Sequence, residues 1–316
     1  MGPGDQGLRL QARQLNLLFA SKIEPAERWL PLLERALPQD KLFLEPRPDI
    51  DIALIASPPP GTFGRLPNLK LVQSLWMGVE KLLADPEMPR NVPFARMVDP
   101  GMVAAMSETV LAHVLDWHRH FWTYRLWQRE KKWRRRRQFM AQDRTVGFLG
   151  LGELGADAAA KLLALGFKVC GWSRRPKNVV GVHCSTDLGE ILQMSDAIVC
   201  LLPLTPQTRG VLNAAAFSRM RASGCVINVA RGAHVVVADM LAALDTRHLA
   251  HAYLDVFDEE PLPADSPLWT HPGVTVTPHI AALTEPRTAV PSIVENVERV
   301  RRGETPLHLV DFAAGY

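Results

Sequence analysis

The segment TVGFLGLGELGADAAAKLLAL, residues 145–165, decides the fold. Its first five residues are apolar and partly β-branched, as in a buried strand, and its last ten are apolar and of helical length. Between them lies the pattern Gly150-Leu151-Gly152-Glu153-Leu154-Gly155. A strand, a GxGxxG pattern and a helix in this order are the fingerprint of a dinucleotide-binding βαβ unit.

Each glycine of this pattern has its own physical task. Gly150 permits a tight turn, Gly152 lets the backbone approach a pyrophosphate, and Gly155 lets the helix pack closely against the strand. The phosphates would lie at the positively polarised helix N-terminus. We therefore predict that Gly150, Gly152, Glu153, Leu154 and Gly155 bind the cofactor. An ordinary glycine turn is the competing interpretation, and the flanking strand and helix argue against it.

The residues after the next predicted strand indicate whether the chain prefers NADH or NADPH. About 20 residues beyond the glycine pattern, an NAD-binding sheet places an Asp or Glu on the ribose 2′-hydroxyl. This chain has Ser173-Arg174-Arg175 there instead. Because an arginine offers a fork of donors to a 2′-phosphate, we predict NADPH as the preferred cofactor, with weaker use of NADH. The alternative is that both arginines are merely solvated.

The rest of the chain alternates short apolar runs with stretches of helical length, which is typical of parallel α/β sheets. Six strands of a doubly wound sheet are predicted at Thr145–Leu149, Val169–Trp172, Ala197–Leu202, Cys225–Val229, Ala252–Val256 and Val274–Thr277. Four earlier strands are predicted at Leu15–Ala20, Ile52–Ala56, Leu69–Ser74 and Phe94–Val98. We expect one long helix from about Met102 past Trp127, and a C-terminal helix over about Glu285–Arg302.

Length and charge set the broad class of protein. The chain has 316 residues, 47% of them hydrophobic, which suffices for two domains with a core each. A formal net charge of +3 creates no global field that favours nucleic acid or a membrane. The basic run Lys131–Arg137 is interpreted as a solvated helix end or a dimer contact, because it lacks an element that reads bases.

Cysteine usage and hydropathy favour a cytoplasmic location. Four cysteines without a CxxC pair are too sparse for a disulfide framework. The apolar run Leu15–Ala20 is too short for a signal-peptide core or a membrane span, so no membrane partner is expected. His113, His118 and His120 lack the i, i+4 spacing of a metal site, and no metal is predicted.

Reactive side chains follow three predicted strands of the second half. Arg231 follows one strand, Glu260 lies in the loop after the next, and His279 follows the last. The carboxyl ends of parallel strands converge on the ligand crevice, so we expect these groups to lie close together. The set suits carbonyl reduction, with Arg231 on a substrate carboxylate, His279 as proton donor and Glu260 orienting the imidazole. Taken singly, His279 could be a structural histidine, Glu260 part of a solvated loop and Arg231 a surface charge at a helix start.

The chain resembles the D-isomer-specific 2-hydroxyacid dehydrogenase family over about residues 72–283. Besides the glycine pattern and the three reactive residues, the matching stretches are Ser74–Val79, Arg96–Gly101, Leu202–Thr208, Leu254–Pro263, Ser266–Trp269 and Pro278-His279. One departure is Glu80, since many relatives have Asp after the Gly-Val pair.

The resemblance implies two doubly wound parallel-sheet α/β domains. Residues 1–101 and 284–316 would form a smaller, discontinuous, flavodoxin-like substrate-binding domain, and residues 102–283 a Rossmann nucleotide-binding domain. Two chains would form a homodimer through helices of the nucleotide domain. The resemblance also places several residues at the cofactor: Leu202, Pro203, Thr205, Thr208, Val229, Ala230 and Asp255.

The resemblance further implies that the loop Trp76-Met77-Gly78-Val79 binds the substrate carboxylate through backbone amides. The bulky Trp76 and Met77 would leave room for only a small 2-oxo acid, such as glyoxylate or hydroxypyruvate. We therefore expect an NADPH-preferring reductase of such acids, without a nucleic-acid partner. Two alternatives stay open: a dehydrogenase of another small D-2-hydroxy acid, and a non-catalytic, dinucleotide-sensing protein similar to the corepressors that share this fold.

Overall fold

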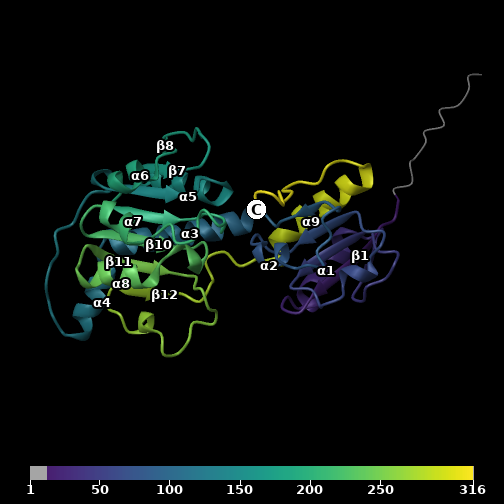
Figure 1. Ribbon diagram of the computed structural model, residues 1–316, viewed down its shortest axis with the longest axis horizontal. Coiled ribbons are helices and arrows are strands. Elements are labelled where there is room, and N and C mark those ends of the chain that lie inside the picture. The colour runs from purple at the N-terminus through teal and green to yellow at the C-terminus, as the bar shows by residue number, and fades with distance from the viewer. Residues whose placement is uncertain (1–12, 316) are drawn as a thin grey trace, which may run out of the picture. The chain divides into compact units, whose positions relative to one another are not determined.

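The computed structural model describes residues 13–315 and consists of two compact units. The first unit comprises residues 1–100 and 284–316, of which 1–12 and 316 lie outside the described residues, and the second comprises residues 101–283. Each unit is built on one sheet whose named strands all pair in parallel (Figure 1). The predicted fold class, two parallel-sheet α/β domains, is confirmed.

The sheet of the first unit has the strand order β2-β1-β3-β4-β5. This is the flavodoxin-like order expected for the smaller domain. Its strands are β1 (Asn16–Ser21), β2 (Lys41–Phe43), β3 (Ile52–Ala56), β4 (Leu71–Ser74) and β5 (Phe94–Ala95). Every residue of the central strand β3 is buried, as a parallel strand covered on both faces requires.

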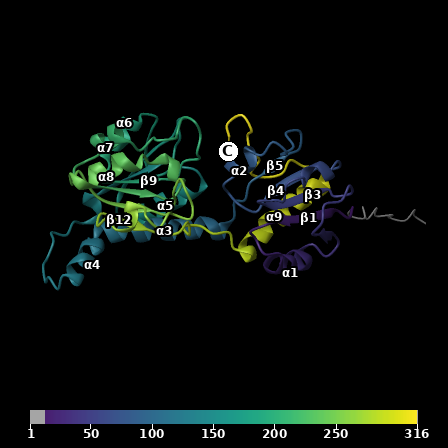
Figure 2. The same cartoon turned by 60° about the horizontal axis from the view of Figure 1, so that its bottom comes forward.

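Helices cover both faces of this sheet. They are α1 (Ala26–Ala36), α2 (Glu80–Leu83) and α9 (Pro286–Arg302), with a 3₁₀ turn at Phe63–Arg65. Helix α1 packs against α9 on one face, while α2 lies on the other (Figure 2). The returning chain is fixed by a buried hydrogen bond from Asn296 Nδ2 of α9 to Gln73 Oε1 of β4, 2.7 Å long.

The sheet of the second unit has the order β12-β11-β10-β9-β6-β7-β8. Its strands are β6 (Thr145–Leu149), β7 (Lys168–Trp172), β8 (His183–Ser185), β9 (Ala197–Cys200), β10 (Gly224–Asn228), β11 (Leu249–Leu254) and β12 (Val274–Val276). The first six strands of this unit follow the order 3-2-1-4-5-6 of dinucleotide-binding folds, and β12 extends one edge. The order in which successive strands are added reverses between β6 and β9, where such sheets bind ligands.

The helices of the second unit form two layers. They are α3 (Pro100–His118), α4 (Phe121–Arg129), α5 (Glu153–Ala164), α6 (Leu188–Met194), α7 (Ala214–Arg219) and α8 (Val237–Asp245), with 3₁₀ turns at Ala141–Asp143, Gly232–His234 and Pro267–Trp269. Buried residues of α3 and α5 pack on one face of the sheet, and those of α6, α7 and α8 pack on the other (Figure 2). No helix within residues 13–315 is long and apolar enough to cross a membrane.

Several secondary-structure predictions differ from the structure. The short strands β2 and β8 were not predicted, and β11 begins at Leu249 rather than at Ala252. The expected continuous helix is two helices, because His120 adopts a left-handed backbone with φ +60°. The basic run Lys131–Arg137 is exposed as predicted, but it follows the end of α4 at Arg129 and has no regular secondary structure, so it is not a helix end.

Candidate active site

The glycine turn between β6 and α5 has the shape that a pyrophosphate needs. Gly150 has φ +99°, and a Cβ on it would lie 2.8 Å from the carbonyl oxygen of Leu201. A Cβ on Gly155 would lie 2.2 Å from Gly150 O, so helix α5 could not pack as it does. A Cβ on Gly152 would meet nothing within 4 Å. The open side of Gly152 at the start of α5 therefore fits the phosphates of a dinucleotide.

Three cations follow β7 beside this turn. Ser173 Oγ donates to Arg175 O at 2.8 Å, and the side chains of Arg174 and Arg175 are exposed. Lys177 Nζ donates to Leu151 O at 2.8 Å, inside the glycine turn. Lys177 was not predicted as a site residue, although a lysine so close to two arginines is a usable signal of one.

The loop after β9 is built around Thr208. The Thr208 hydroxyl accepts from Thr205 N and donates to Pro203 O, both at 2.8 Å, and both threonines are buried. The loop is joined to the neighbouring Arg231 turn by a hydrogen bond from Leu212 N to His234 O, 2.9 Å long. Leu202, Pro203 and Thr208, predicted to lie at the cofactor, thus belong to one internally braced loop next to the strand-order reversal.

The turn after β10 holds Arg231 through two buried polar side chains. Asn228 Oδ1 accepts from Ala230 N at 3.2 Å, while its Nδ2 donates to Arg231 O at 2.8 Å. The ring nitrogen Nδ1 of fully buried His234 lies 3.2 Å from Arg231 N. Sequence reasoning missed both residues, although Asn228 ends an otherwise apolar strand that leads through Val229 and Ala230.

The Arg231 turn lies directly against the loop that carries Glu260. A Cβ on Gly232 would be 2.0 Å from the carbonyl carbon of Phe257 and 2.3 Å from Asp258 N. Only glycine allows this approach, which brings the loops after β10 and β11 into contact.

Asp255, directly after β11, fixes the position of the segment that carries His279. Its buried carboxylate accepts from Thr277 Oγ1 at 2.7 Å, Ile280 N at 3.0 Å and Ala281 N at 2.9 Å. Since three donors already engage this carboxylate, its most direct effect is on the position of the histidine segment. Contact between Asp255 and the cofactor stays a prediction.

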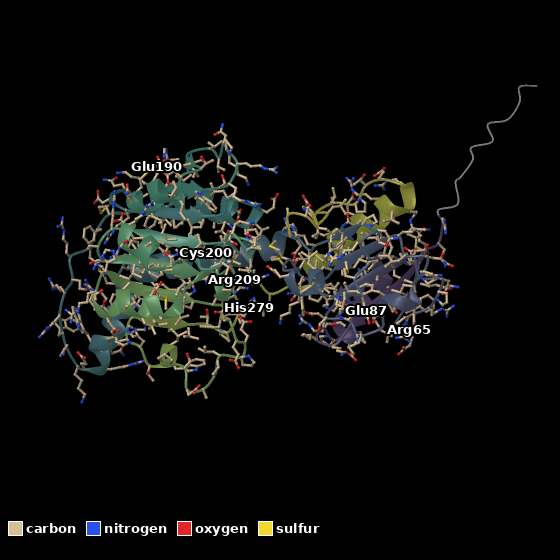
Figure 3. The ribbon with its side chains drawn as sticks, in the orientation of Figure 1. Arg65, Glu87, Glu190, Cys200, Arg209 and His279 are labelled. Carbon is tan, nitrogen blue, oxygen red and sulfur yellow. The ribbon has the colours of Figure 1, made fainter. Side chains whose placement is uncertain are left out.

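The imidazole and carboxylate predicted to cooperate form a direct pair. His279 Nδ1 lies 2.7 Å from Glu260 Oε2, and Glu260 Oε1 accepts from Phe257 N at 2.9 Å. His279 has φ +54°, an uncommon backbone for a non-glycine residue. Figure 3 shows His279 at the same edge of the seven-stranded sheet as Arg209 of the β9 loop. Because Nδ1 is engaged, Nε2 is the nitrogen that can give a proton to a substrate.

The predicted substrate loop of the first unit follows β4. Ser74 Oγ accepts from Trp76 N at 3.0 Å, and Met97 N donates to Trp76 O at 3.0 Å. The indole Nε1 of Trp76 donates to Glu24 Oε1 at 2.9 Å, while Glu24 Oε2 accepts from Trp29 Nε1 at 3.1 Å. Glu24 thereby fixes Trp76, and no sequence signal could have shown it, since the two residues are 52 positions apart.

The other backbone amides of this loop are available to an anion. Among the described residues, the N–H groups of Met77, Gly78 and Val79 have no hydrogen-bond acceptor. A carboxylate is the kind of group that such amides bind.

The structure thus places Arg231, Glu260 and His279 after the adjacent strands β10, β11 and β12. The glycine turn follows β6 of the same parallel sheet, so all four lie at its carboxyl edge. Within residues 13–315, no group of three or more His, Cys, Asp or Glu side chains is arranged to hold a metal ion.

Comparison with known proteins agrees with this geometry. The family described as "D-isomer specific 2-hydroxyacid dehydrogenase, NAD binding domain" matches residues 111–281. The chain is 38% identical over 313 residues to the glyoxylate/hydroxypyruvate reductase A of Photorhabdus laumondii, covering 96% of this chain and 100% of that protein. The chain belongs to the D-isomer specific 2-hydroxyacid dehydrogenase family. A family relative from Yersinia enterocolitica with the same name is 39% identical over the same shares of both chains.

Solved structures of this dehydrogenase family have the same fold. A D-isomer specific 2-hydroxyacid dehydrogenase from Xanthobacter autotrophicus, in complex with NADPH and MES, has a TM-score of 0.92 and 42% identity over 96% of this chain and 100% of that chain. An NADPH-dependent glyoxylate/hydroxypyruvate reductase from Sinorhizobium meliloti, in complex with NADP and sulfate, has a TM-score of 0.90 and 37% identity over the same shares.

Proposed function

We propose that the protein is an NADPH-preferring reductase of small 2-oxo acids, which converts glyoxylate to glycolate and hydroxypyruvate to D-glycerate. The observation that carries the proposal is the 2.7 Å pair of His279 and Glu260 at the carboxyl edge of a dinucleotide-binding sheet. It is supported by relatives at 38% and 39% identity that are named glyoxylate/hydroxypyruvate reductase A.

The reaction adds one hydride and one proton across a carbonyl group. NADPH, when bound, supplies the hydride to the carbonyl carbon. His279 Nε2 gives its proton to the carbonyl oxygen, so that the 2-oxo acid becomes a 2-hydroxy acid. Glu260 keeps Nδ1 protonated and the ring oriented. The half-exposed His279 then regains a proton from solvent.

Substrate recognition divides between charge and shape. Arg231 pairs with the substrate carboxylate and polarises the adjacent carbonyl group. From the family resemblance we also infer that the amides of the loop Trp76-Met77-Gly78-Val79 bind a substrate carboxylate. The large side chains of Trp76 and Met77 restrict the substituent on the 2-oxo acid, and the hydrogen bond that Trp76 Nε1 donates to Glu24 holds the indole in place.

Cofactor choice follows from the loop after β7. Ser173, Arg174 and Arg175 bind the ribose 2′-phosphate of NADPH, where an NAD-specific sheet would place a carboxylate. Gly150, Gly152 and Gly155, with Glu153 and Leu154 between them, bind the pyrophosphate. The remaining contacts come from Leu202, Pro203, Thr208, Val229, Ala230 and Asp255. Relatives crystallised with NADPH and NADP support this assignment.

The same proposal assigns roles to the two parts of the chain. Residues 1–101 and 284–316 form the substrate-binding domain and residues 102–283 the nucleotide-binding domain. Two copies associate as a homodimer through helices of the nucleotide domain, and the enzyme works in the cytoplasm. Its free cysteines suit a reducing compartment, and burial raises the pKa of Cys200 to about 12.

The test is a spectrophotometric assay of the purified protein. Loss of reduced-nicotinamide absorbance is followed with glyoxylate, hydroxypyruvate and pyruvate, using NADPH or NADH at equal concentration. We expect turnover of the first two acids with NADPH. His279→Ala should lower kcat by about 10²-fold or more, the usual contribution of general acid catalysis, while NADPH still binds.

Two results would contradict the proposal. Near-normal turnover of His279→Ala would remove the proton-donor role. Tight NADPH binding by the unaltered protein without turnover of any 2-oxo acid would favour the dinucleotide-sensing alternative.

A further inference from the structure

One carboxylate of the first unit joins two indole rings. Glu24 lies between β1 and α1, and its Oε1 accepts from Trp76 Nε1 at 2.9 Å while its Oε2 accepts from Trp29 Nε1 at 3.1 Å. Because both oxygens act as acceptors, this is the bonding pattern of an ionised carboxylate. Glu24 therefore links the predicted substrate loop to helix α1.

The Trp29 end of this link is anchored in the core. Trp29 is fully buried, and its ring centroid lies 6.2 Å from that of Phe19 in β1. The backbone of Glu24 is fixed as well, because its N–H donates to Ser21 Oγ at 2.7 Å. The carboxylate is thus held from the core side, and Trp76 is the partner whose position depends on it.

Trp76 is held at its backbone and at its ring. Its N–H donates to Ser74 Oγ and its carbonyl oxygen accepts from Met97 N, both at 3.0 Å. With the ring nitrogen bonded to Glu24, the indole cannot turn aside without breaking a charge-assisted hydrogen bond. A substrate group that meets this ring therefore meets a fixed wall.

Glu24 also brings a negative charge to this wall. Among residues 13–315, its carboxylate bonds to the two indoles and makes no ion pair. Arg28 of α1 pairs instead with Glu285 Oε2, at 3.5 Å. A second carboxylate on the substrate, placed against the indole of Trp76, would therefore face a like charge that no cation offsets.

We propose that Glu24 determines substrate specificity, by confining the enzyme to 2-oxo monocarboxylic acids with a small, uncharged substituent. Its hydrogen bond to Trp76 excludes larger substituents, and its charge excludes dicarboxylic acids. The proposal rests on the proposed reductase function, in which Trp76 faces the substituent. It assigns a role to a residue that acts on the substrate through another side chain and through its charge.

Three acids separate size from charge in a spectrophotometric assay with NADPH. Glyoxylate has only hydrogen as its substituent, 2-oxosuccinamate has a neutral amide group, and oxaloacetate has a carboxylate of nearly the same size in place of that amide. For the unaltered protein we expect kcat/KM to fall in this order.

Two variants of Glu24 separate its two effects. Glu24→Gln has no charge and one acceptor oxygen, which buried Trp29 retains because an unsatisfied buried donor is costly, so Trp76 is released. We expect kcat/KM for 2-oxosuccinamate to rise at least about tenfold relative to that for glyoxylate. That for oxaloacetate should rise about tenfold relative to 2-oxosuccinamate, since the repulsion is gone. Glu24→Asp keeps the charge but is too short to bridge both indoles, so only the first ratio should rise.

The chain supplies a matched control three residues further on. Glu27 is exposed in the first turn of α1, so Glu27→Gln removes the same charge without touching either indole bond. We expect this control to keep both ratios of the unaltered protein, and thermal melting to show that all three variants fold.

Four results would overturn the proposal. Unchanged ratios in Glu24→Gln, while the unaltered protein reduces glyoxylate, would remove the role of Glu24 alone. An equal fall in kcat/KM for all three acids would make Glu24 a structural residue. An equal shift in Glu27→Gln would mean diffuse charge repulsion. No glyoxylate turnover by the unaltered protein would overturn the proposed function itself, and the role of Glu24 with it.

Discussion

The backbone N–H of His279 donates a hydrogen bond of 2.8 Å to the carbonyl oxygen of Asp255. The carboxylate of Asp255, which is 1% exposed, accepts from Thr277 Oγ1 and from the amides of Ile280 and Ala281. The left-handed backbone of His279 persists because its neighbours over-determine it. Asp255 therefore acts as a positioning residue for the proton donor.

Thr277→Val tests this positioning without changing any charge. The variant loses the 2.7 Å bond to Asp255, so we expect the free energy of unfolding to fall by about 1 kcal/mol. We also expect kcat to fall several-fold, with KM and the Kd for NADPH nearly unchanged, because the imidazole is misplaced while binding groups stay. Thr246→Val, directly after α8, removes an exposed hydroxyl bonded to Ala242 O and should leave kcat unaltered. If Thr277→Val is less stable but keeps the full kcat, Asp255 has only a structural role.

Two glycines of one motif should respond differently to the same added methyl group. Gly152→Ala points its Cβ into open space, so the protein should lose at most about 1 kcal/mol, as for a helix N-cap change, but bind NADPH at least about tenfold more weakly. Gly155→Ala places its Cβ 2.2 Å from Gly150 O, so it should unfold at clearly lower denaturant concentration. Fluorescence titration and urea melts separate the two effects. Equal NADPH affinity in Gly152→Ala and the unaltered protein would disprove the pyrophosphate assignment.

The central strands could be predicted because both of their faces are buried. Strands such as β3, β6 and β9 are continuous apolar runs, and each is buried throughout. The three-residue edge strands β2 and β8 are half-exposed, and neither contains an apolar run long enough to stand out as a strand. The break between α3 and α4 depends on one left-handed residue, His120, which interrupts no hydrophobic period.

Some residues of the candidate site could likewise be predicted from the sequence, and others could not. Residues with chemistry of their own, such as Arg231 and His279, could be predicted because parallel strands deliver their carboxyl ends to one edge. The residues that hold them could not, since they act through contacts between distant positions. Glu24 on Trp76 and Asn228 on the Arg231 turn are examples.

Reversing the charge at Arg174 should lower the preference for NADPH over NADH. Arg174→Asp replaces a donor for the 2′-phosphate with a carboxylate that repels it and accepts from a ribose hydroxyl. We expect the ratio of kcat/KM for NADPH to that for NADH to fall by about 10–100-fold, equivalent to roughly 1.5–3 kcal/mol for a charge-assisted hydrogen bond. Arg134→Asp makes the same charge change in the exposed segment after α4 and should leave the ratio unchanged. An unaltered ratio in Arg174→Asp would refute the NADPH assignment of this loop.

The buried side chain of His251 should make the folded protein less stable in mild acid. It is 2% exposed, stacked on Trp122 at 4.6 Å, with Nε2 2.8 Å from Thr275 Oγ1. Burial lowers its pKa from 6.5 to about 3, and the nearby Asp116 carboxylate only partly opposes this. Between pH 6.5 and about pH 3, His251 is protonated in the unfolded chain but neutral in the folded chain. The free energy of unfolding therefore falls as the pH falls through this range.

The measurement compares urea unfolding at pH 7.5 and pH 5 for the unaltered protein and His251→Phe. From pH 7.5 to pH 5 the histidine alone should remove about 2 kcal/mol, at 1.36 kcal/mol per pH unit below 6.5. Phenylalanine keeps a ring against Trp122 but cannot be protonated, so the variant should lose about 2 kcal/mol less over this interval. Its stability at pH 7.5 provides the baseline, because the buried histidine is neutral there. Equal losses in the two proteins would mean that the folded chain accepts the proton on His251, against the burial that lowers its pKa.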